Sequence, residues 1–146
     1  MSQVKRKIDW KTYLAHLGFM ADCTKVAGNQ VVVGLTRGGL TPATYLSHQL
    51  GIPMIAFDPH MLHANGDERA PIHLPINPPV ITKIIIVDDI SDTGITFKKC
   101  FNFFNKRGFS CTTMSVFING EVTEFVPDYP GEETNNEWIV FPYETE

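Results

Sequence analysis

Hydrophobic and polar positions along the chain form blocks that predict strands and helices in turn. Four segments predict strands, and the first of them is a short continuous apolar run, the pattern of a strand buried on both faces of a sheet. They occupy 31–35, 52–57, 83–89 and 110–118. Three other segments carry helix-like apolar patterns. They are 9–28, 40–51 and 95–108. This alternation predicts an α/β fold with a doubly wound, mostly parallel sheet flanked by helices.

Two of the predicted helices carry faces that we expect to be buried. In the first helix, Asp9 is the expected N-cap and Gly28 the expected end. Its apolar face comprises Trp10, Tyr13, Leu14, Leu17 and Met20. In the last helix, three phenylalanines crowd together at a spacing that predicts core or subunit interface rather than a ligand site. They are Phe101, Phe103 and Phe104.

Length and composition predict one domain. The chain has 146 residues, of which 43% are hydrophobic and 19% charged, which is ordinary for a globular domain with a real core. Between 58 and 82 the periodicity is lost, and proline, histidine, asparagine and glycine are frequent. A loop of that length is either functional or a wrong assignment of elements. We predict a single domain, 1–146, with its core at about 1–118.

Charge and targeting signals exclude several classes of partner. The net charge is −4 and no basic stripe is present, so we do not expect nucleic-acid binding. No apolar run is long enough to cross a bilayer, and the basic start MSQVKRKIDW lacks the apolar region of a secretory signal. We therefore expect no membrane partner.

Cysteine and histidine usage predicts a cytoplasmic protein without a metal cluster of its own. The three cysteines are widely spaced and form no CxxC pair, which is typical of free thiols in a reducing compartment. His60, His63 and His73 lack helical ligand spacing and have no cysteine nearby, so we expect loop residues rather than zinc ligands.

Candidate chemistry lies where two predicted strands end. TRGG follows 31–35, and the third strand runs into carboxylates within IIIVDDISDTGIT (84–96). In a parallel sheet, ligands bind beyond the carboxyl ends of the strands. The stretch 92–96 opens a helix with free N–H groups, a glycine and two hydroxyls, which suits a phosphate. Asp88 and Asp89 suit sugar hydroxyls or a hydrated Mg²⁺. Together these features predict a site for a phosphorylated sugar.

Three segments carry a resemblance to a known family. IIIVDDISDTGIT resembles the phosphoribosyl-pyrophosphate motif of the type I phosphoribosyltransferases, and TRGGLTPATYLSHQLG resembles their pyrophosphate loop and following helix. WIVFPYE resembles the C-terminal base-binding segment of the bacterial xanthine-guanine and archaeal guanine enzymes. The resemblance runs from about residue 30 to 144. It implies the type I phosphoribosyltransferase fold, with a mobile loop at about 58–82 and a small base-binding hood at about 119–146.

The resemblance also implies an activity and a cofactor. The expected reaction is transfer of 5-phosphoribosyl from 5-phosphoribosyl 1-pyrophosphate (PRPP) to a purine base in purine salvage, with release of pyrophosphate and with Mg²⁺ at Asp89. The expected 5′-phosphate ligands are Asp92, Thr93, Gly94, Ile95 and Thr96. The expected pyrophosphate ligands are Thr36, Arg37, Gly38 and Gly39, in a loop whose peptide is often cis in this family. Family members of this size are commonly homodimers or homotetramers.

On the base side, the resemblance favours 6-oxopurines, namely guanine, xanthine or hypoxanthine. Asp92 stands where those enzymes carry an acid before Thr-Gly, and it is the expected general base for the purine N7 proton. Trp138 is expected to stack on the base and the backbone of Ile139 to read its edge. The family lysine that donates to the purine O6 is replaced by Asn119, whose neutral amide donates a weaker hydrogen bond.

Alternatives stay open at this point. The aspartates can form a solvated turn, Arg37 an ordinary surface residue, and Trp138 a core or dimer contact. The family's serine-tyrosine pair is missing from the loop at 58–82, where Arg69 is a candidate to close over pyrophosphate. The same fold also serves as a non-catalytic sensor of PRPP or nucleotides, and a transferase for a different base is a further alternative.

Overall fold

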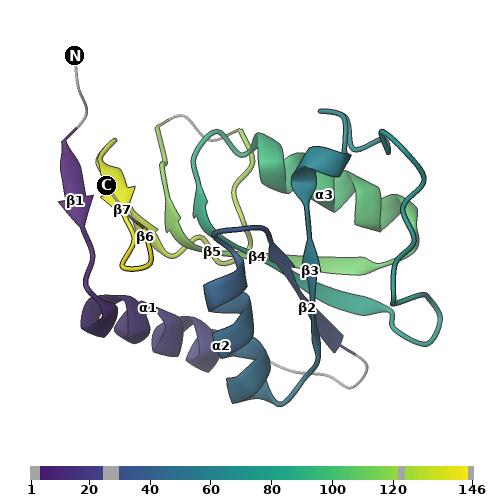
Figure 1. Cartoon of the computed structure of the whole chain (residues 1–146), viewed down its shortest axis with the longest axis horizontal. Coiled ribbons are helices and arrows are strands. Elements are labelled where there is room, and N and C mark those ends of the chain that lie inside the picture. Colours follow the sequence, from purple (N-terminus) through teal and green to yellow (C-terminus); the bar gives the residue numbers. More distant parts are fainter. Residues whose placement is uncertain (1–3, 25–29, 122–123, 145–146) are drawn as a thin grey trace.

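A computed structural model describes residues 4–24, 30–121 and 124–144 and contains a five-stranded sheet in the order β3-β2-β4-β5-β6 (Figure 1). Every neighbouring pair is parallel. The strands are β2 (Gln30–Leu35), β3 (Met54–Phe57), β4 (Lys83–Ser91), β5 (Ser110–Ile118) and β6 (Glu132–Glu133). The predicted doubly wound, mostly parallel sheet is confirmed, and β6 is an addition that the apolar pattern did not reveal.

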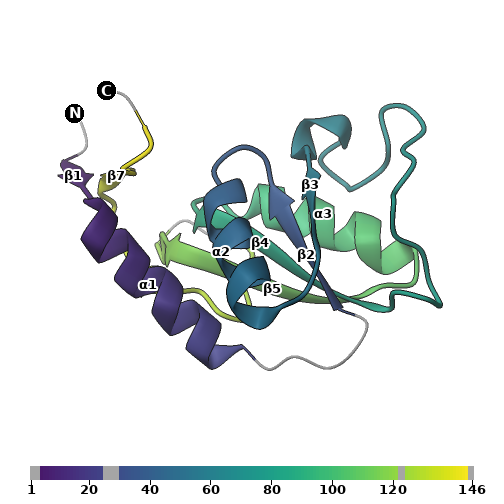
Figure 2. The ribbon, with the colours of Figure 1, turned by 60° about the horizontal axis from the view of Figure 1, so that its bottom comes forward.

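Helices cover both faces of this sheet, as Figures 1 and 2 show. α1 (Trp10–Cys23) and α2 (Leu40–Leu50) lie on one face, and α3 (Ile95–Lys106) lies on the other. Gly51 ends α2 in the left-handed conformation that favours glycine (φ 67°). The predicted starts at 40 and 95 are confirmed.

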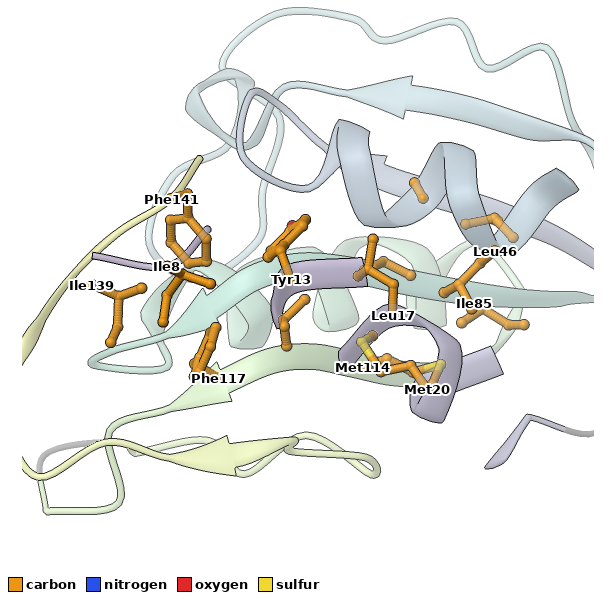
Figure 3. Packing of buried hydrophobic residues seen from close by; sticks show 14 residues of the cluster. Ile8, Tyr13, Leu17, Met20, Leu46, Ile85, Met114, Phe117, Ile139 and Phe141 are labelled. Atoms are coloured by element: carbon orange, nitrogen blue, oxygen red, sulfur yellow. The ribbon is translucent and has the colours of Figure 1, made fainter. Parts of the chain in front are cut away.

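The core consists of two layers, one on each face. In β4, Ile85 and Val87 pack with α1 and α2, whereas Ile84 and Ile86 pack with α3. This alternation is why the strand is apolar without interruption. Figure 3 shows the first layer, in which Tyr13, Leu17, Leu46 and Ile85 are labelled.

The predicted face of α1 is only partly correct. Tyr13, Leu17 and Met20 are buried, but Trp10 and Leu14 are 49% and 47% exposed. α1 lies beside α2 and packs on the sheet with a narrower stripe than the full apolar face, which leaves the flanking positions in solvent. Asp9 is the N-cap, as predicted, and accepts a hydrogen bond from the Thr12 N–H at 2.8 Å.

The observed end of α1 differs from the predicted one. α1 stops at Cys23 with Thr24 as its C-cap, whereas the predicted end, Gly28, lies outside the described residues. In α3, Phe103 and Phe104 are buried in the core and Phe101 is partly exposed beside Phe125. Within the described residues, no helix is both long and apolar enough to cross a bilayer.

A second, two-stranded sheet joins the two ends of the chain. β1 (Lys5–Lys7) pairs in parallel with β7 (Trp138–Val140), and Figures 1 and 2 place them at one end of the molecule. Glu132 of β6 accepts from Arg6 at 3.1 Å and contacts the His16 ring at 2.6 Å. The C-terminal hood therefore includes an N-terminal strand and is anchored on α1, which the sequence did not predict.

The segment 58–82 is tied down on α3. After the short 3₁₀ helix η1 (Pro59–Met61), three apolar side chains are buried in the α3-side core. They are Leu62, Ile72 and Ile76. Glu68 forms an ion pair with Arg107, and the Arg69 Nε donates to the Leu62 carbonyl at 3.2 Å. If this segment moves to cover the site, the part buried against α3 would have to stay in place. The Arg69 side chain points back to its own loop, through its hydrogen bond to Leu62.

Candidate active site

The loops that follow β2 and β4 meet at the carboxyl edge of the sheet. A Cβ on Gly38 would lie 2.1 Å from Oδ2 of Asp89, and a Cβ on Gly39 would lie 2.4 Å from the carbonyl oxygen of Val87. Glycines are required here because only they allow one loop to approach the other this closely. The structure therefore brings together the TRGG loop and the aspartate pair, which are about 50 positions apart in the sequence.

The TRGG loop presents its arginine to a cavity. The Thr36–Arg37 peptide is cis, as the resemblance implied. The Gly39 N–H donates to the Leu35 carbonyl at 2.8 Å and leads the chain into α2. Arg37 is exposed and lines a cavity of about 830 Å³. The other lining residues are Thr36, Gly38, Asp58, His60, Asp89, Tyr143 and Glu144.

The aspartate pair is held by hydrogen bonds near the end of β4. Oδ1 of Asp88 accepts from the Asp89 N–H at 2.9 Å, and Oδ1 of Asp89 accepts from the Ile90 N–H at 2.7 Å. Burial raises the pKa of Asp88 well above its ordinary value, and the neighbouring charge of Asp89 raises it further. Burial also raises the pKa of Asp89, although the hydrogen bond from Tyr143 opposes that rise. Both shifts mean that this end of β4 disfavours negative charge on the two carboxyl groups when no cation is bound.

The start of α3 has the features expected of a phosphate site. Gly94 is its N-cap, in a left-handed conformation with φ 86°. Oγ1 of Thr93 accepts from the Ile95 N–H at 3.3 Å, and Ile95 is 44% exposed. N–H groups at a helix start point outward and carry the positive end of the helix dipole. This end of α3 can bind a phosphate through Thr93, Gly94, Ile95 and Thr96.

Asp92 and Asn119 are also brought together. Asn119 follows β5 and is buried, with 4% of its surface exposed. Its Nδ2 donates to Oδ1 of Asp92 at 3.1 Å and to Oδ1 of Asn136 at 3.3 Å. Asn136 has a positive φ of 57°, which asparagine tolerates better than most residues. Both amide hydrogens are therefore engaged by side chains at this end of the site.

The two hood residues differ in exposure. Trp138 is 56% exposed on β7, whereas Ile139 is buried. Among the described residues, Trp138 has no aromatic partner, so its ring is available for stacking. The backbone of Ile139 pairs with β1 at Arg6. The core alternative for Trp138 is therefore ruled out by its exposure, whereas its predicted role with the base stays a prediction.

Sequence reasoning missed five residues of this region: Asp58, His60, Asn136, Tyr143 and Glu144. Tyr143 and Glu144 lie in WIVFPYE, which was assigned to the base, yet they line the cavity beside Arg37. In the sequence, the resemblance of WIVFPYE was the one sign that these two residues belong to the site. Tyr143 and Glu144 are far from the TRGG loop along the chain, so the sequence did not indicate that they lie beside it.

The residues around the cavity fit a magnesium ion that arrives with its substrate. Asp89, Asp58 and Glu144 supply carboxylate oxygens, which Mg²⁺ prefers. Within the described residues, no three acidic, histidine or cysteine side chains lie close enough to hold a metal by themselves. Mg²⁺ is commonly bound by one or two carboxylates plus substrate phosphates. An ion here would also favour the charged form of Asp88 and Asp89, which burial disfavours.

Replacing Asp88 with asparagine is expected to stabilise the free protein. The raised folded-state pKa of Asp88 means that its ionisation above that pKa disfavours folding. The amide removes the charge but keeps the oxygen that accepts from Asp89. In the absence of Mg²⁺, Tm should rise by about a few degrees at neutral pH. The difference should shrink on acidification, as wild-type Asp88 becomes protonated. Calorimetric unfolding at both pH values tests this, and a lower Tm for Asp88→Asn at neutral pH would contradict it.

Comparison with known proteins agrees with this geometry. The family description "Phosphoribosyl transferase domain" matches residues 10–146. The xanthine-guanine phosphoribosyltransferase of Gluconobacter oxydans is 30% identical over 120 residues, which cover 78% of this chain and 68% of that protein. The same-named protein of Cereibacter sphaeroides is 29% identical over 121 residues, covering 79% and 69%.

Solved structures agree as well. The purine phosphoribosyltransferase from Pyrococcus horikoshii superposes with a TM-score of 0.80 and 31% identity, over 97% of this chain and 95% of that one. The xanthine-guanine-hypoxanthine phosphoribosyltransferase of Helicobacter pylori has a TM-score of 0.72 over 96% and 92% of the two chains, and at 16% identity it supports the fold alone. The match across nearly the whole chain means that this protein belongs to the phosphoribosyl transferase domain family.

Proposed function

We propose that the protein is a purine phosphoribosyltransferase that transfers the 5-phosphoribosyl group of PRPP to a purine base and releases pyrophosphate. One observation carries the proposal. Asp89, Arg37 and Gly38 line one cavity at the carboxyl edge of the sheet, next to the strand end that leads into α3. Pyrophosphate, ribose and 5′-phosphate are linked in PRPP in the same order.

The donor half of the site binds PRPP through charge and backbone. Arg37 and the close-packed glycine loop hold the pyrophosphate, and the start of α3 holds the 5′-phosphate. Asp88 and Asp89 accept from the ribose hydroxyls, with Asp89 on the metal side. When bound, Mg²⁺ neutralises negative charge on the departing pyrophosphate. The protein's net charge of −4 does not oppose an anionic donor, because these local groups set the field.

Asp92 is proposed as the general base for the purine. The ring must lose a proton as its nitrogen attacks the anomeric carbon, and a carboxylate within hydrogen-bond reach can accept that proton. The Asn119 amide donates to Oδ1 of Asp92 at 3.1 Å, and Oδ2 is the oxygen proposed to take the purine proton. Asn119 therefore acts on Asp92 as a positioning residue, in addition to its place beside the base.

The proposed base is a 6-oxopurine, namely guanine, xanthine or hypoxanthine. The acid at 92 and the exposed ring of Trp138 support this choice, as do the names of the relatives. No charged donor stands at 119, and both hydrogens of the Asn119 amide are already engaged. We therefore expect the 6-oxo group to be bound through a water or another neutral donor, or by an Asn119 amide that gives up one of these hydrogen bonds, and less tightly than by a lysine.

Two properties of the whole protein complete the proposal. We place it in the cytoplasm, since Cys23, Cys100 and Cys111 are free thiols, as is usual in a reducing compartment. We also propose a homodimer or homotetramer. Exposed apolar side chains such as Phe19 and Val126, 69% and 65% exposed, are candidates for subunit contacts.

A panel of bases tests the proposed function. Purified protein with PRPP and Mg²⁺ is offered guanine, xanthine, hypoxanthine, adenine, orotate and uracil, and release of pyrophosphate is recorded. We expect turnover with at least one 6-oxopurine. Turnover with adenine or a pyrimidine alone would overturn the base assignment. Tight binding of PRPP without any turnover would favour a sensor on the same fold.

A further inference from the structure

The C-terminal segment reaches the donor side of the cavity through one tyrosine. The Tyr143 hydroxyl lies 2.9 Å from Oδ2 of Asp89, to which it donates, and 3.3 Å from the carbonyl oxygen of Gly38. Asp89 is 54 positions away in the chain and Gly38 is 105 positions away. One hydroxyl therefore contacts the aspartate on the metal side and the pyrophosphate loop at once.

The turn and the ring fix this hydroxyl in place. The Phe141 N–H donates to Oε1 of Glu144 at 2.9 Å, and the Glu144 N–H donates to the Phe141 carbonyl at 3.0 Å, which closes a tight turn around Tyr143. The Tyr143 ring stacks on Phe141 with centroids 5.6 Å apart and meets the edge of Tyr13 at 5.9 Å. The ring is therefore held by packing that does not depend on its hydroxyl.

The hydroxyl donates to a carboxylate that is also held at its other oxygen. Burial raises the pKa of Tyr143 far above its ordinary value, and the charge of Asp89 raises it further. Oδ1 of Asp89 already accepts from the Ile90 N–H, so the two hydrogen bonds together fix both oxygens of this carboxylate and leave one lone pair on each for a ligand.

We propose that Tyr143 is a positioning residue for donor binding. Its hydroxyl sets the orientation of Asp89 relative to Gly38, and thus the spacing between the metal-side carboxylate and the pyrophosphate loop. The role rests on the proposed function, since it acts on the PRPP half of that site. It also links the two halves, because Tyr143 follows β7, which carries Trp138, by only a few residues. The hood then does more than cover the base, since it also prepares the site for PRPP.

Removal of the Tyr143 hydroxyl alone is expected to weaken the binding of PRPP. Tyr143→Phe keeps the stacked ring, while Asp89 loses its charge-assisted hydrogen bond and can rotate away from the geometry that the ligand needs. Residues that orient metal ligands typically change metal affinity by about 10- to 100-fold when removed. We expect the Kd for PRPP with Mg²⁺ to rise about tenfold, and KM for PRPP to rise in parallel. The kcat at saturating PRPP and KM for the purine should change less than about twofold.

Titration calorimetry of PRPP with Mg²⁺ into the free protein measures this without turnover. The matched control is Tyr129→Phe, which removes a partly exposed tyrosine hydroxyl from the β5 side of the molecule, away from the cavity. Control and wild type should bind PRPP equally. If wild type and Tyr143→Phe bind with the same Kd, the positioning role is overturned while the proposed function stands. If wild type takes up no PRPP, both are overturned.

A double-mutant cycle with Asp89→Asn identifies the path of the effect. The asparagine keeps an oxygen at this position but removes the charge that Tyr143 orients. If Tyr143 acts through Asp89, Tyr143→Phe should raise Kd much less in the Asp89→Asn background than in the wild type. An equal fold-increase in both backgrounds would contradict the proposal, because the hydroxyl would then act through the packing of the hood.

Discussion

Asp92→Asn is expected to lower kcat with a 6-oxopurine by at least about 100-fold, which is the low end of the contribution of general-base catalysis. An amide cannot take the ring proton. Its oxygen can still accept from Asn119, so the local packing around the buried Asn119 should survive. The Kd for PRPP should change little, because N–H groups at the start of α3 do not depend on the charge at 92.

Steady-state turnover and calorimetry on the same preparation separate these effects. Asp22→Asn, an exposed aspartate of α1 far along the chain from the site, is the matched control and should behave as wild type. If Asp92→Asn keeps wild-type kcat, another group takes the proton. If it instead loses PRPP affinity with kcat intact, Asp92 belongs to the phosphate site alone.

Gly38→Ala is expected to weaken PRPP binding by about 100-fold, the scale on which misplacing a binding group by about 1 Å is felt. The added methyl would lie 2.1 Å from Oδ2 and 2.5 Å from Cγ of Asp89. Real atoms cannot approach so closely, so the carboxylate must turn away from the cavity and from Tyr143. Since a side chain can yield where a backbone cannot, the fold should persist with a modest loss of Tm.

Two other glycine variants make that result specific. Gly39→Ala would place a methyl 2.4 Å and 2.6 Å from the backbone oxygens of Val87 and Leu35, so it should lower the free energy of unfolding far more than Gly38→Ala. Gly18→Ala, in the middle of α1 with its nearest neighbour at 3.6 Å, should leave PRPP binding unchanged and raise stability slightly. Equal PRPP affinity for Gly38→Ala and wild type would mean that the loop does not contact Asp89 as the structure has it.

Local patterns in the sequence determined the sheet, the helices and the family. The segments at 83–89 and 110–118 became β4 and β5 within two residues, because β-branched and apolar residues suit strands buried in a sheet. The motif IIIVDDISDTGIT is contiguous, so its strand end, its acids and its helix start could be read together. The TRGG loop could be placed beside it because parallel strands end at the same edge. The fold and the family are confirmed, and the roles of Asp92, Arg37, Asn119 and Trp138 stay predictions.

Contacts between distant segments were decided only by the tertiary structure. β1 and β7 are three residues each, too short to carry a pattern, and they pair because folding brings the first and last parts of the chain side by side. The segment 58–82 looked free, but its scattered apolar residues are buried against α3. Tyr143 looked like part of a base pocket until folding placed its hydroxyl against Asp89. A sequence shows how each segment buries its own apolar face, whereas a single side chain's partner depends on how several segments pack at once.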